Sequence, residues 1–245
     1  ATVVLALFAL LALLPVILIA VASVTDENAL VANGYTYFPV KLSLDSYYYM
    51  VKQSAMILRS YGITILVTVV GTLGSLMLTT TLAYPMSRRD FRYKNALAFF
   101  VFFTMLFNGG VVSSYIMWSR IFSIKNTLWA LVVPNYLVTA FNVLLVRNYY
   151  MNSIPHEMVE SAQIDGASEL TIFLKVMLPL AVPTVATISL FTGLIYWNDW
   201  VNCLYYVTDS KLYGLQNLLI RIMNNIQFLK ISTNAALLGT QNVDL

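Results

Sequence analysis

Five long stretches without a charged side chain dominate this sequence and restrict what it can fold into. They cover residues 1–25, 60–87, 95–119, 126–146 and 176–198. A helix of about 20 apolar residues crosses about 30 Å of hydrocarbon, so each stretch is long enough to span a membrane. Charged residues make up only 10% of the chain, whereas a soluble domain carries about 25%. The sequence therefore predicts an integral membrane protein.

Helices, rather than the strands of a β-barrel, are expected to form these spans. Barrel strands alternate apolar and polar residues over about ten positions, but residues 5–14 are apolar on every side. We expect an all-α, polytopic bundle with spans near 3–24, 61–84, 96–119, 127–146 and 180–206. At the C-terminal end, residues 212–220 are short and interrupted by polar side chains, which predicts an interfacial or re-entrant piece rather than a sixth span.

The short loops predict the orientation of the bundle. Residues 88–94 hold four basic side chains in seven positions, and such loops stay in the cytoplasm. This places segment 147–179 and the N-terminus inside and the tyrosine-rich loop 25–59 outside. The chain begins with Ala1 and has no basic region ahead of its first apolar run, so we expect that run to be a span and not a cleaved signal peptide.

Segment 147–179 differs from the rest of the chain because it holds four of the eleven acidic residues and the only histidine. Pro155 is a plausible first residue of a helix, and Gly166 can supply the left-handed residue that ends one. A second helical run over 168–178 then leads to Pro179 and Pro183 at the entry to the fifth span. The pattern predicts a short helix lying across the cytoplasmic face.

The spacing within this segment is distinctive. Glu160-Ser161-Ala162 is followed by three residues, Gly166, nine residues and Val176-Met177-Leu178-Pro179. It resembles the EAA-type loop of binding-protein-dependent ABC importer permeases, which reads E-A-A, three residues, G, nine residues and I-x-L-P. The string Asp165-Gly166-Ala167 resembles the carbohydrate-uptake, maltose-permease-like branch of that family, and the likeness extends over essentially the whole chain.

The resemblance implies a type I ABC importer permease fold in a single transmembrane domain, 1–245, of a multi-pass cell-membrane protein. In this family the loop helix docks on a cytoplasmic ATPase subunit and transmits its closure to the membrane helices. The residues implied in ATPase coupling are Glu160, Ser161, Ala162, Asp165, Gly166, Leu178 and Pro179. The family has six core spans in this subunit, so we expect one span to be missing here.

The resemblance also implies the partners of the chain. They are a second, related permease subunit in a heterodimer, a cytoplasmic ATPase dimer that binds ATP and Mg²⁺, an extracellular solute-binding protein, membrane lipid and a carbohydrate substrate. This chain itself is expected to bind no cofactor and to be no enzyme, because it has no G-x-x-x-x-G-K-[ST] phosphate-binding loop.

Polar and aromatic side chains gather in the fifth predicted span. At helical spacing Asp199 and Asn202 share a face, and Asp199 is the one acidic residue in or beside a span. Such residues are costly in a membrane and often functional. A sugar path fits this mixture of hydrogen-bonding and stacking groups, and an interfacial aromatic belt fits it equally. The candidate path residues are Tyr196, Trp197, Asn198, Asp199 and Asn202.

Other features favour structural roles. Phe107-Asn108-Gly109-Gly110 in the third span could bend the helix, but close helix packing is the favoured interpretation. Gly71 and Gly74 predict close helix contacts, and Asn142 predicts a hydrogen bond to a neighbouring helix. His156 has no further ligand-type residue at metal-binding spacing, so we expect no metal site.

Two other classes of protein remain as alternatives. A secondary transporter or channel without an ATPase predicts intramembrane charge pairs or inverted repeats, and a membrane-embedded enzyme predicts a clustered catalytic set. Neither explains the Glu160-to-Pro179 spacing. Nucleic-acid binding is not expected, because the chain has no large basic surface.

Overall fold

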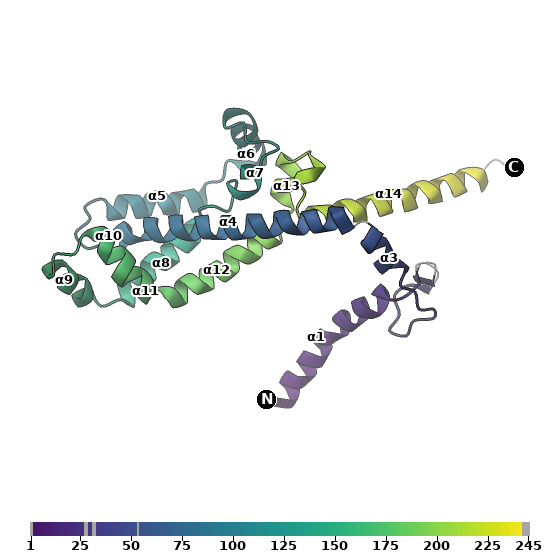
Figure 1. Cartoon of the computed structure of the whole chain (residues 1–245), viewed down its shortest axis with the longest axis horizontal. Coiled ribbons are helices and arrows are strands. Elements are labelled where there is room, and N and C mark those ends of the chain that lie inside the picture. The colour runs from purple at the N-terminus through teal and green to yellow at the C-terminus, as the bar shows by residue number, and fades with distance from the viewer. Residues whose placement is uncertain (1, 27–28, 31–32, 53, 242–245) are drawn as a thin grey trace. The chain divides into compact units, whose positions relative to one another are not determined.

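The computed structural model describes residues 2–26, 29–30, 33–52 and 54–241, and every regular element in these ranges is helical (Figure 1). One isolated antiparallel bridge pairs Thr25 with Leu42. The chain divides into two units, residues 1–59 and 60–245. The expected all-α class is confirmed within the described residues.

The first unit contains α1 (Thr2–Ser23) and α3 (Asp45–Lys52). Among the described residues, 4–23 of α1 form one of two unbroken helices that are long and apolar enough to cross a membrane. None of the side chains in its most apolar stretch is buried within the protein. This helix therefore presents apolar side chains all round, as a helix surrounded by lipid or by other apolar helices does.

The long helix α4 (Ser54–Ser87) is the other unbroken candidate span, and most of it belongs to the second unit. Most of its buried residues are small, among them Gly71, Ser75 and Thr79. The ring of Tyr196 lies against Gly71, where an added Cβ would come within 2.5 Å of it. At Gly74 an added Cβ would lie 3.2 Å from Leu137. The close helix contact expected at Gly71 is confirmed, whereas Gly74 lies against the irregular segment between Val132 and Ala140 rather than against a helix.

The third predicted span is two helices rather than one. α5 (Lys94–Leu106) is followed by α6 (Gly110–Ile116) and a π-helical turn, η1 (Met117–Ile121), and the direction changes by 112° between them. Gly110 adopts a φ of +81°, which glycine reaches without steric cost. An added Cβ on Gly110 would meet nothing within 4 Å. The packing interpretation of these glycines was therefore wrong, and they form a sharp bend.

The fourth predicted span is also interrupted. α7 (Trp129–Val132) and α8 (Ala140–Asn152) are separated by an irregular segment. Asn135 within that segment has a φ of +69°, and Pro134 just before it cannot donate a helical hydrogen bond. The prediction that one helix spans 127–146 was therefore wrong. Asn142 of α8 donates a hydrogen bond to the hydroxyl of Thr192 at 3.4 Å, as expected.

The fifth predicted span begins and ends at breaks. α10 (Glu169–Ile172), the π-helical turn η2 (Phe173–Met177) and α11 (Leu178–Leu180) lead into α12 (Val182–Trp197) through a bend of 77°. α13 (Val201–Tyr206) follows after a second break. The prediction that one helix spans 180–206 was wrong, because Asn198, Asp199 and Trp200 lie outside both α12 and α13.

The C-terminal part of the described chain contains a short 3₁₀ turn, η3 (Ser210–Leu212), and α14 (Leu215–Gln241). The prediction of a short piece over 212–220 was therefore wrong, because a helix of 27 residues begins within that segment, at Leu215. Its polar residues do not interrupt the helix, since Asn217 is buried and donates to the carbonyl of Trp200 at 3.4 Å. The described helices give two unbroken candidate spans, or four if each bent pair counts as one.

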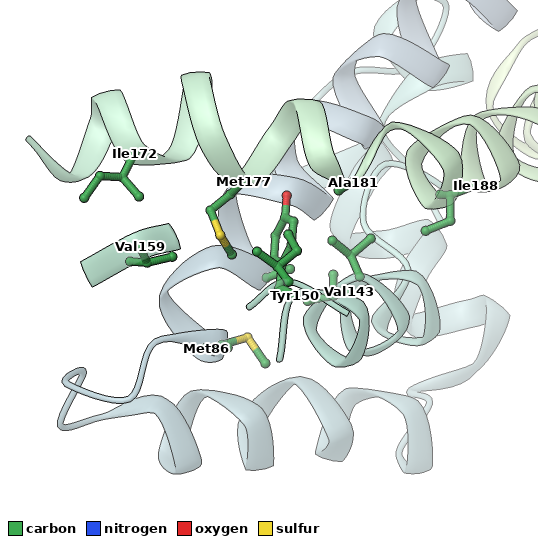
Figure 2. Close-up of a cluster of buried hydrophobic side chains, with 11 residues drawn as sticks. Met86, Val143, Tyr150, Val159, Ile172, Met177, Ala181 and Ile188 are labelled. Carbon is green, nitrogen blue, oxygen red and sulfur yellow. The ribbon is translucent and has the colours of Figure 1, made fainter. Parts of the chain in front are cut away.

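Within the second unit α8 packs against both α5 and α12 (Figure 1). Figure 2 shows one apolar core of this unit, where Met86 of α4, Tyr150 of α8 and Met177 of η2 converge. Val159 joins this core from α9 (His156–Ile164). The core therefore joins the segment that carries the acidic residues to the bundle.

Candidate functional site

The helix expected at the start of the acidic segment is α9. Pro155 directly precedes its first residue, and the helix ends in a Schellman motif. The backbone amide of Ala167 donates to the backbone carbonyl of Ala162 at 2.9 Å, and the backbone amide of Gly166 donates to the backbone carbonyl of Gln163 at 3.0 Å. Gly166 has a φ of +77°. Its predicted role as the left-handed residue that ends a helix is confirmed.

Most of the surface of α9 is open. Val159 is its only buried residue, and Ala162 is half-buried. Glu160, Ser161 and Asp165 are exposed, and the side chain of Ile164 is 86% exposed. A short helix that is held by one buried side chain and shows both acidic and apolar groups is suited to contact another chain.

The predicted coupling residues fall on two elements. Five lie on α9 or its C-terminal turn, namely Glu160, Ser161, Ala162, Asp165 and Gly166. Leu178 and Pro179 belong instead to α11, at the bend before α12. The hydroxyl of Tyr149 donates to the carbonyl of Leu180 at 3.2 Å, so α8 holds this bend.

Glu169, at the start of α10, joins α9 to α4 and was given no role by the sequence. Its carboxylate accepts hydrogen bonds from the hydroxyl of Tyr84, from the guanidinium of Arg88 at 3.1 Å and from the amide of Gln163 at 3.2 Å. The bond from Tyr84, together with the positive charge of Arg88, lowers the pKa of the Glu169 carboxyl. We call these four residues the Glu169 cluster.

Arg88 is the buried member of this cluster, with a side chain only 7% exposed. It also lies 3.4 Å from the carboxylate of Asp90, which is 72% exposed. A buried guanidinium requires charged or hydrogen-bonding partners. Tyr84 and Arg88 are separated from Glu169 by 85 and 81 residues, so only the fold reveals that they meet.

The predicted path residues form a second polar group, at the other end of α12. The hydroxyl of Tyr196 donates to the backbone carbonyl of Val132 at 2.8 Å, and the side-chain amide of Asn202 donates to the backbone carbonyl of Pro134 at 3.0 Å. The side chain of Asn135 completes the bonding of Asn202 at 3.0 Å. These bonds fasten α12 to the last residue of α7 and α13 to the irregular segment that follows α7.

Asp199 occupies the break between α12 and α13. Its Oδ1 accepts from the backbone amides of Val201 at 3.0 Å and Asn202 at 3.2 Å, and from the hydroxyl of Tyr136 at 3.3 Å. The carboxylate therefore satisfies the first amides of α13, a common role for an acidic residue at a helix start. We call Tyr136, Tyr196, Asp199 and Asn202 the Tyr196 cluster.

The remaining predicted path residues lie at the edge of this cluster. Tyr196 and Asn202 are buried, Trp197 is half-buried and Asn198 is exposed. A cavity of about 20 Å³ touches Asp199, Tyr196 and Thr64 of α4, which is space for about one water molecule. The structure thus brings Tyr196, Asp199 and Asn202 together and leaves Trp197 and Asn198 at the periphery.

Comparison with known proteins gives one consistent result. The family described as "Binding-protein-dependent transport system inner membrane component" matches residues 75–239. The chain is 37% identical to the polygalacturonan/rhamnogalacturonan transport system permease protein YtcP of Bacillus subtilis, over 89% of this chain and 74% of that protein. It is 37% identical to protein LplC of the same organism, over 86% of this chain and 70% of that protein.

A solved structure gives the same result for the fold. A chain from a bacterial ABC transporter involved in the import of the acidic polysaccharide alginate superimposes with a TM-score of 0.78 at 31% identity. The match covers 88% of this chain and 75% of the other. This chain therefore shares its overall fold with a chain of a solved transporter.

Proposed function

This chain belongs to the family of binding-protein-dependent transport system inner membrane components, and we propose that it is the permease subunit of an ATP-driven importer of oligosaccharides. The observation that carries the proposal is the match of the family over residues 75–239, which include α9 and its open surface. An ABC permease does not hydrolyse ATP itself, so a partner subunit supplies the ATPase.

The coupling segment is the stretch 154–179. In the proposed complex α9 lies on the ATPase, with Glu160 and Asp165 offering carboxylates for charge-assisted hydrogen bonds and Ile164 offering apolar area. Gly166, which has no side chain, ends the helix, and Leu178 and Pro179 hold the bend into α12. A second permease subunit and an extracellular binding protein complete the assembly.

The proposed topology counts each broken helix as one crossing. α1, α4, α5 with α6, α7 with α8, and α12 with α13 then form five crossings, with the N-terminus in the cytoplasm. The four basic side chains of loop 88–94 support this orientation. The same orientation places α9 and the Glu169 cluster on the cytoplasmic side, where an ATPase is found.

The substrate class is inferred from relatives. YtcP is named for polygalacturonan and rhamnogalacturonan, and a protein of Halalkalibacterium halodurans that is 26% identical over 91% of this chain is named for arabinooligosaccharides. Trp197 and Asn198, at the accessible edge of the Tyr196 cluster, are the proposed contacts of the sugar. Tyr196, Asp199 and Asn202 hold that edge in place.

Co-purification tests the coupling segment. The Glu160→Lys and Gly166→Pro variants are expected to insert normally but to lose the ATPase during purification in mild detergent. Asp45→Lys makes the same charge change on an exposed residue of the first unit and is expected to retain the ATPase. If both coupling variants retain the ATPase and normal uptake, α9 is not the docking helix.

Uptake into vesicles tests the substrate class. The complete complex is supplied in turn with oligosaccharides from galacturonan, from alginate and from neutral arabinan, each with its binding protein. ATP-dependent accumulation of at least one is expected. Accumulation without an ATPase partner would instead identify a secondary transporter, and accumulation of none of the sugars would contradict the proposed substrate class.

A further inference from the structure

We infer that the Glu169 cluster is the positioning device that couples α9 to α4 during transport, with Glu169 as its central residue. This inference rests on the proposed function, because its readout is substrate moved per ATP hydrolysed. It concerns residues outside the Glu160-to-Gly166 stretch that forms the docking helix. Glu169 acts through Arg88 and Tyr84, and it touches neither substrate nor nucleotide.

The packing of α9 alone does not hold this helix firmly on the bundle. Val159 is its single buried side chain, and a cavity of about 520 Å³ lies beside its first turn, lined by residues that include His156, Glu157 and Arg89. Apart from Val159 only the half-buried Ala162 of this helix packs against the core, and a helix with open space on one side and so few apolar contacts can tilt at low cost. A second attachment is therefore needed if a movement of α9 is to reach the membrane helices.

Glu169 provides this attachment at the point where α9 turns into α10. Gln163, on the last turn of α9, donates to Oε1 of Glu169 at 3.2 Å, and Arg88 donates to the same oxygen at 3.1 Å. Tyr84 donates to the other oxygen. One carboxylate thus connects the end of α9 to the last turn of α4 and to the residue that follows it.

The backbone connects α9 to the bundle less directly than the Glu169 cluster does. From α10 the backbone passes through the π-helical turn η2 and a bend of 77° before it reaches α12. α4 is a single helix of 34 residues, and its Tyr84 and Thr64 lie far apart along it. Thr64 accepts a hydrogen bond from the amide of Leu215 at 2.9 Å. A displacement applied at Arg88 is therefore transmitted by a rigid element to the start of α14.

The charge of Glu169 is the part of the device that an amide cannot replace. Arg88 is buried, and its contact with its other carboxylate partner, Asp90, is the weaker one. The N–O distance is 3.4 Å to Asp90 and 3.1 Å to Glu169, and Asp90 is the more exposed of the two carboxylates. Without the charge on Glu169 the guanidinium would be drawn toward Asp90 and water, and α9 would lose its fixed position relative to α4.

The test uses the complete reconstituted importer and compares Glu169→Gln with the matched control Asp90→Asn, which removes the other carboxylate from the same guanidinium. Glu169→Gln is expected to keep the ATPase bound and hydrolysing, with an unchanged KM for the sugar. The sugar moved per ATP should fall about fivefold or more, the usual lower range of allosteric coupling. Asp90→Asn should leave this ratio within twofold of the wild type.

A double variant separates coupling from general destabilisation. If Tyr84 and Glu169 act as one unit, Tyr84→Phe combined with Glu169→Gln is no worse than the more severe single variant. Effects that multiply, or an unchanged ratio in Glu169→Gln, would overturn the inference. A wild-type complex that neither binds an ATPase nor moves sugar would contradict the proposed function instead, so the two failures are distinguishable.

Discussion

The Glu169 cluster and the Tyr196 cluster both fasten other elements near α4, but they are built from different chemistry. In the Glu169 cluster the carboxylate is 58% exposed and meets a buried guanidinium. In the Tyr196 cluster the buried Tyr196 and Asn202 donate to backbone carbonyls that face no solvent. The first joins side chains of separate elements through charge, and the second fixes side chains on the backbone at the end of α7 and in the irregular segment that follows it.

This difference indicates different tasks. Water can replace the partner of the exposed Glu169 carboxylate at modest cost, and the buried Arg88 keeps Asp90 as a second carboxylate when that contact opens. A buried neutral hydrogen bond has no such replacement, and its loss leaves an unpaired carbonyl. The Glu169 cluster is therefore suited to an attachment that moves, and the Tyr196 cluster to a fixed point. The predictions below test that contrast, beginning with the largest expected effect.

Gly71→Val is expected to damage the fixed point most. An added Cβ would lie 2.5 Å from the ring of Tyr196, and this ring cannot swing away without breaking its hydrogen bond to Val132. Overpacking of this kind costs about 1–3 kcal/mol, and sometimes more. Thermal unfolding of the purified protein in detergent should show a clearly lower midpoint.

Gly62→Ala is the matched control on the same helix. A Cβ at Gly62 meets nothing within 4 Å, and alanine favours a helix over glycine by about 1 kcal/mol. The midpoint should stay level or rise. An equal loss in both variants would show that α4 tolerates no added methyl group and that the Tyr196 contact is not the cause.

Asn202→Ala tests the hydrogen bonds of the fixed point. The variant leaves the carbonyl of Pro134 and the amide of Asn135 without their partner. Unpaired buried groups cost about 1–3 kcal/mol, although hydrogen bonds between membrane helices average only about 0.6 kcal/mol. We expect a loss of stability between these values, measured by thermal unfolding. A variant as stable as the wild type would mean that water enters the cluster.

Asn202→Asp is the corresponding control, because it keeps the size of the side chain and the acceptor for Asn135 while removing the donor to Pro134. It should be less stable than the wild type if the donated bond matters. If only the alanine variant is affected, packing rather than hydrogen bonding fixes this segment.

Local signals in the sequence predicted the parts of the fold that depend on neighbouring residues. The turn at Gly166 was predicted because only a few residue types adopt its backbone conformation, and most of α4 was predicted because residues 60–87 carry no charge. The charge-free stretches overlap both unbroken candidate spans and both bent helix pairs. They did not reveal the bends, because a lipid-compatible composition is the same for a straight helix and a broken one.

The contacts that define both clusters depend on distant residues and were missed. Glu169 was visible as an acidic residue and Arg88 as part of a basic loop, but nothing local indicates that they pair. Asp199 was predicted to share a helix face with Asn202, whereas it lies in a break and accepts from the backbone of α13. A helical face cannot be inferred across a break that the sequence does not mark.

Gly166→Ala is expected to have a smaller effect than the variants of the fixed point. A φ of +77° strains any residue with a Cβ by about 1–2 kcal/mol, and no neighbour adds a clash. The strain falls on the end of α9, so binding of the ATPase should weaken while the thermal midpoint hardly changes. Affinity between purified ATPase and permease measures this.

Gly166→Asn provides the control, because asparagine enters the left-handed region more easily than alanine. Binding should recover toward the wild type. Equal losses with alanine and asparagine would show that the ATPase approaches too closely for any side chain, and that the backbone conformation is not the deciding factor.

The pH dependence of the Glu169 cluster is the smallest expected effect. Tyr84, Arg88 and Gln163 contact Glu169, and Asp90 contacts the same guanidinium. The pKa of Glu169 is lowered from its ordinary value of 4.5. A carboxyl with a lowered pKa stabilises the folded state above the ordinary value, and this stabilisation disappears as the pH falls through the folded value.

The stability difference between the wild-type complex and Glu169→Gln should therefore remain constant from about pH 8 to about pH 5 and shrink only in more acidic solution. Thermal unfolding of both complexes across this range measures it. A difference that shrinks already between neutral pH and pH 5 would mean that Glu169 has a raised pKa, as a carboxylate enclosed without Arg88 would have. The cluster would then resemble the buried fixed point rather than an open, charged attachment.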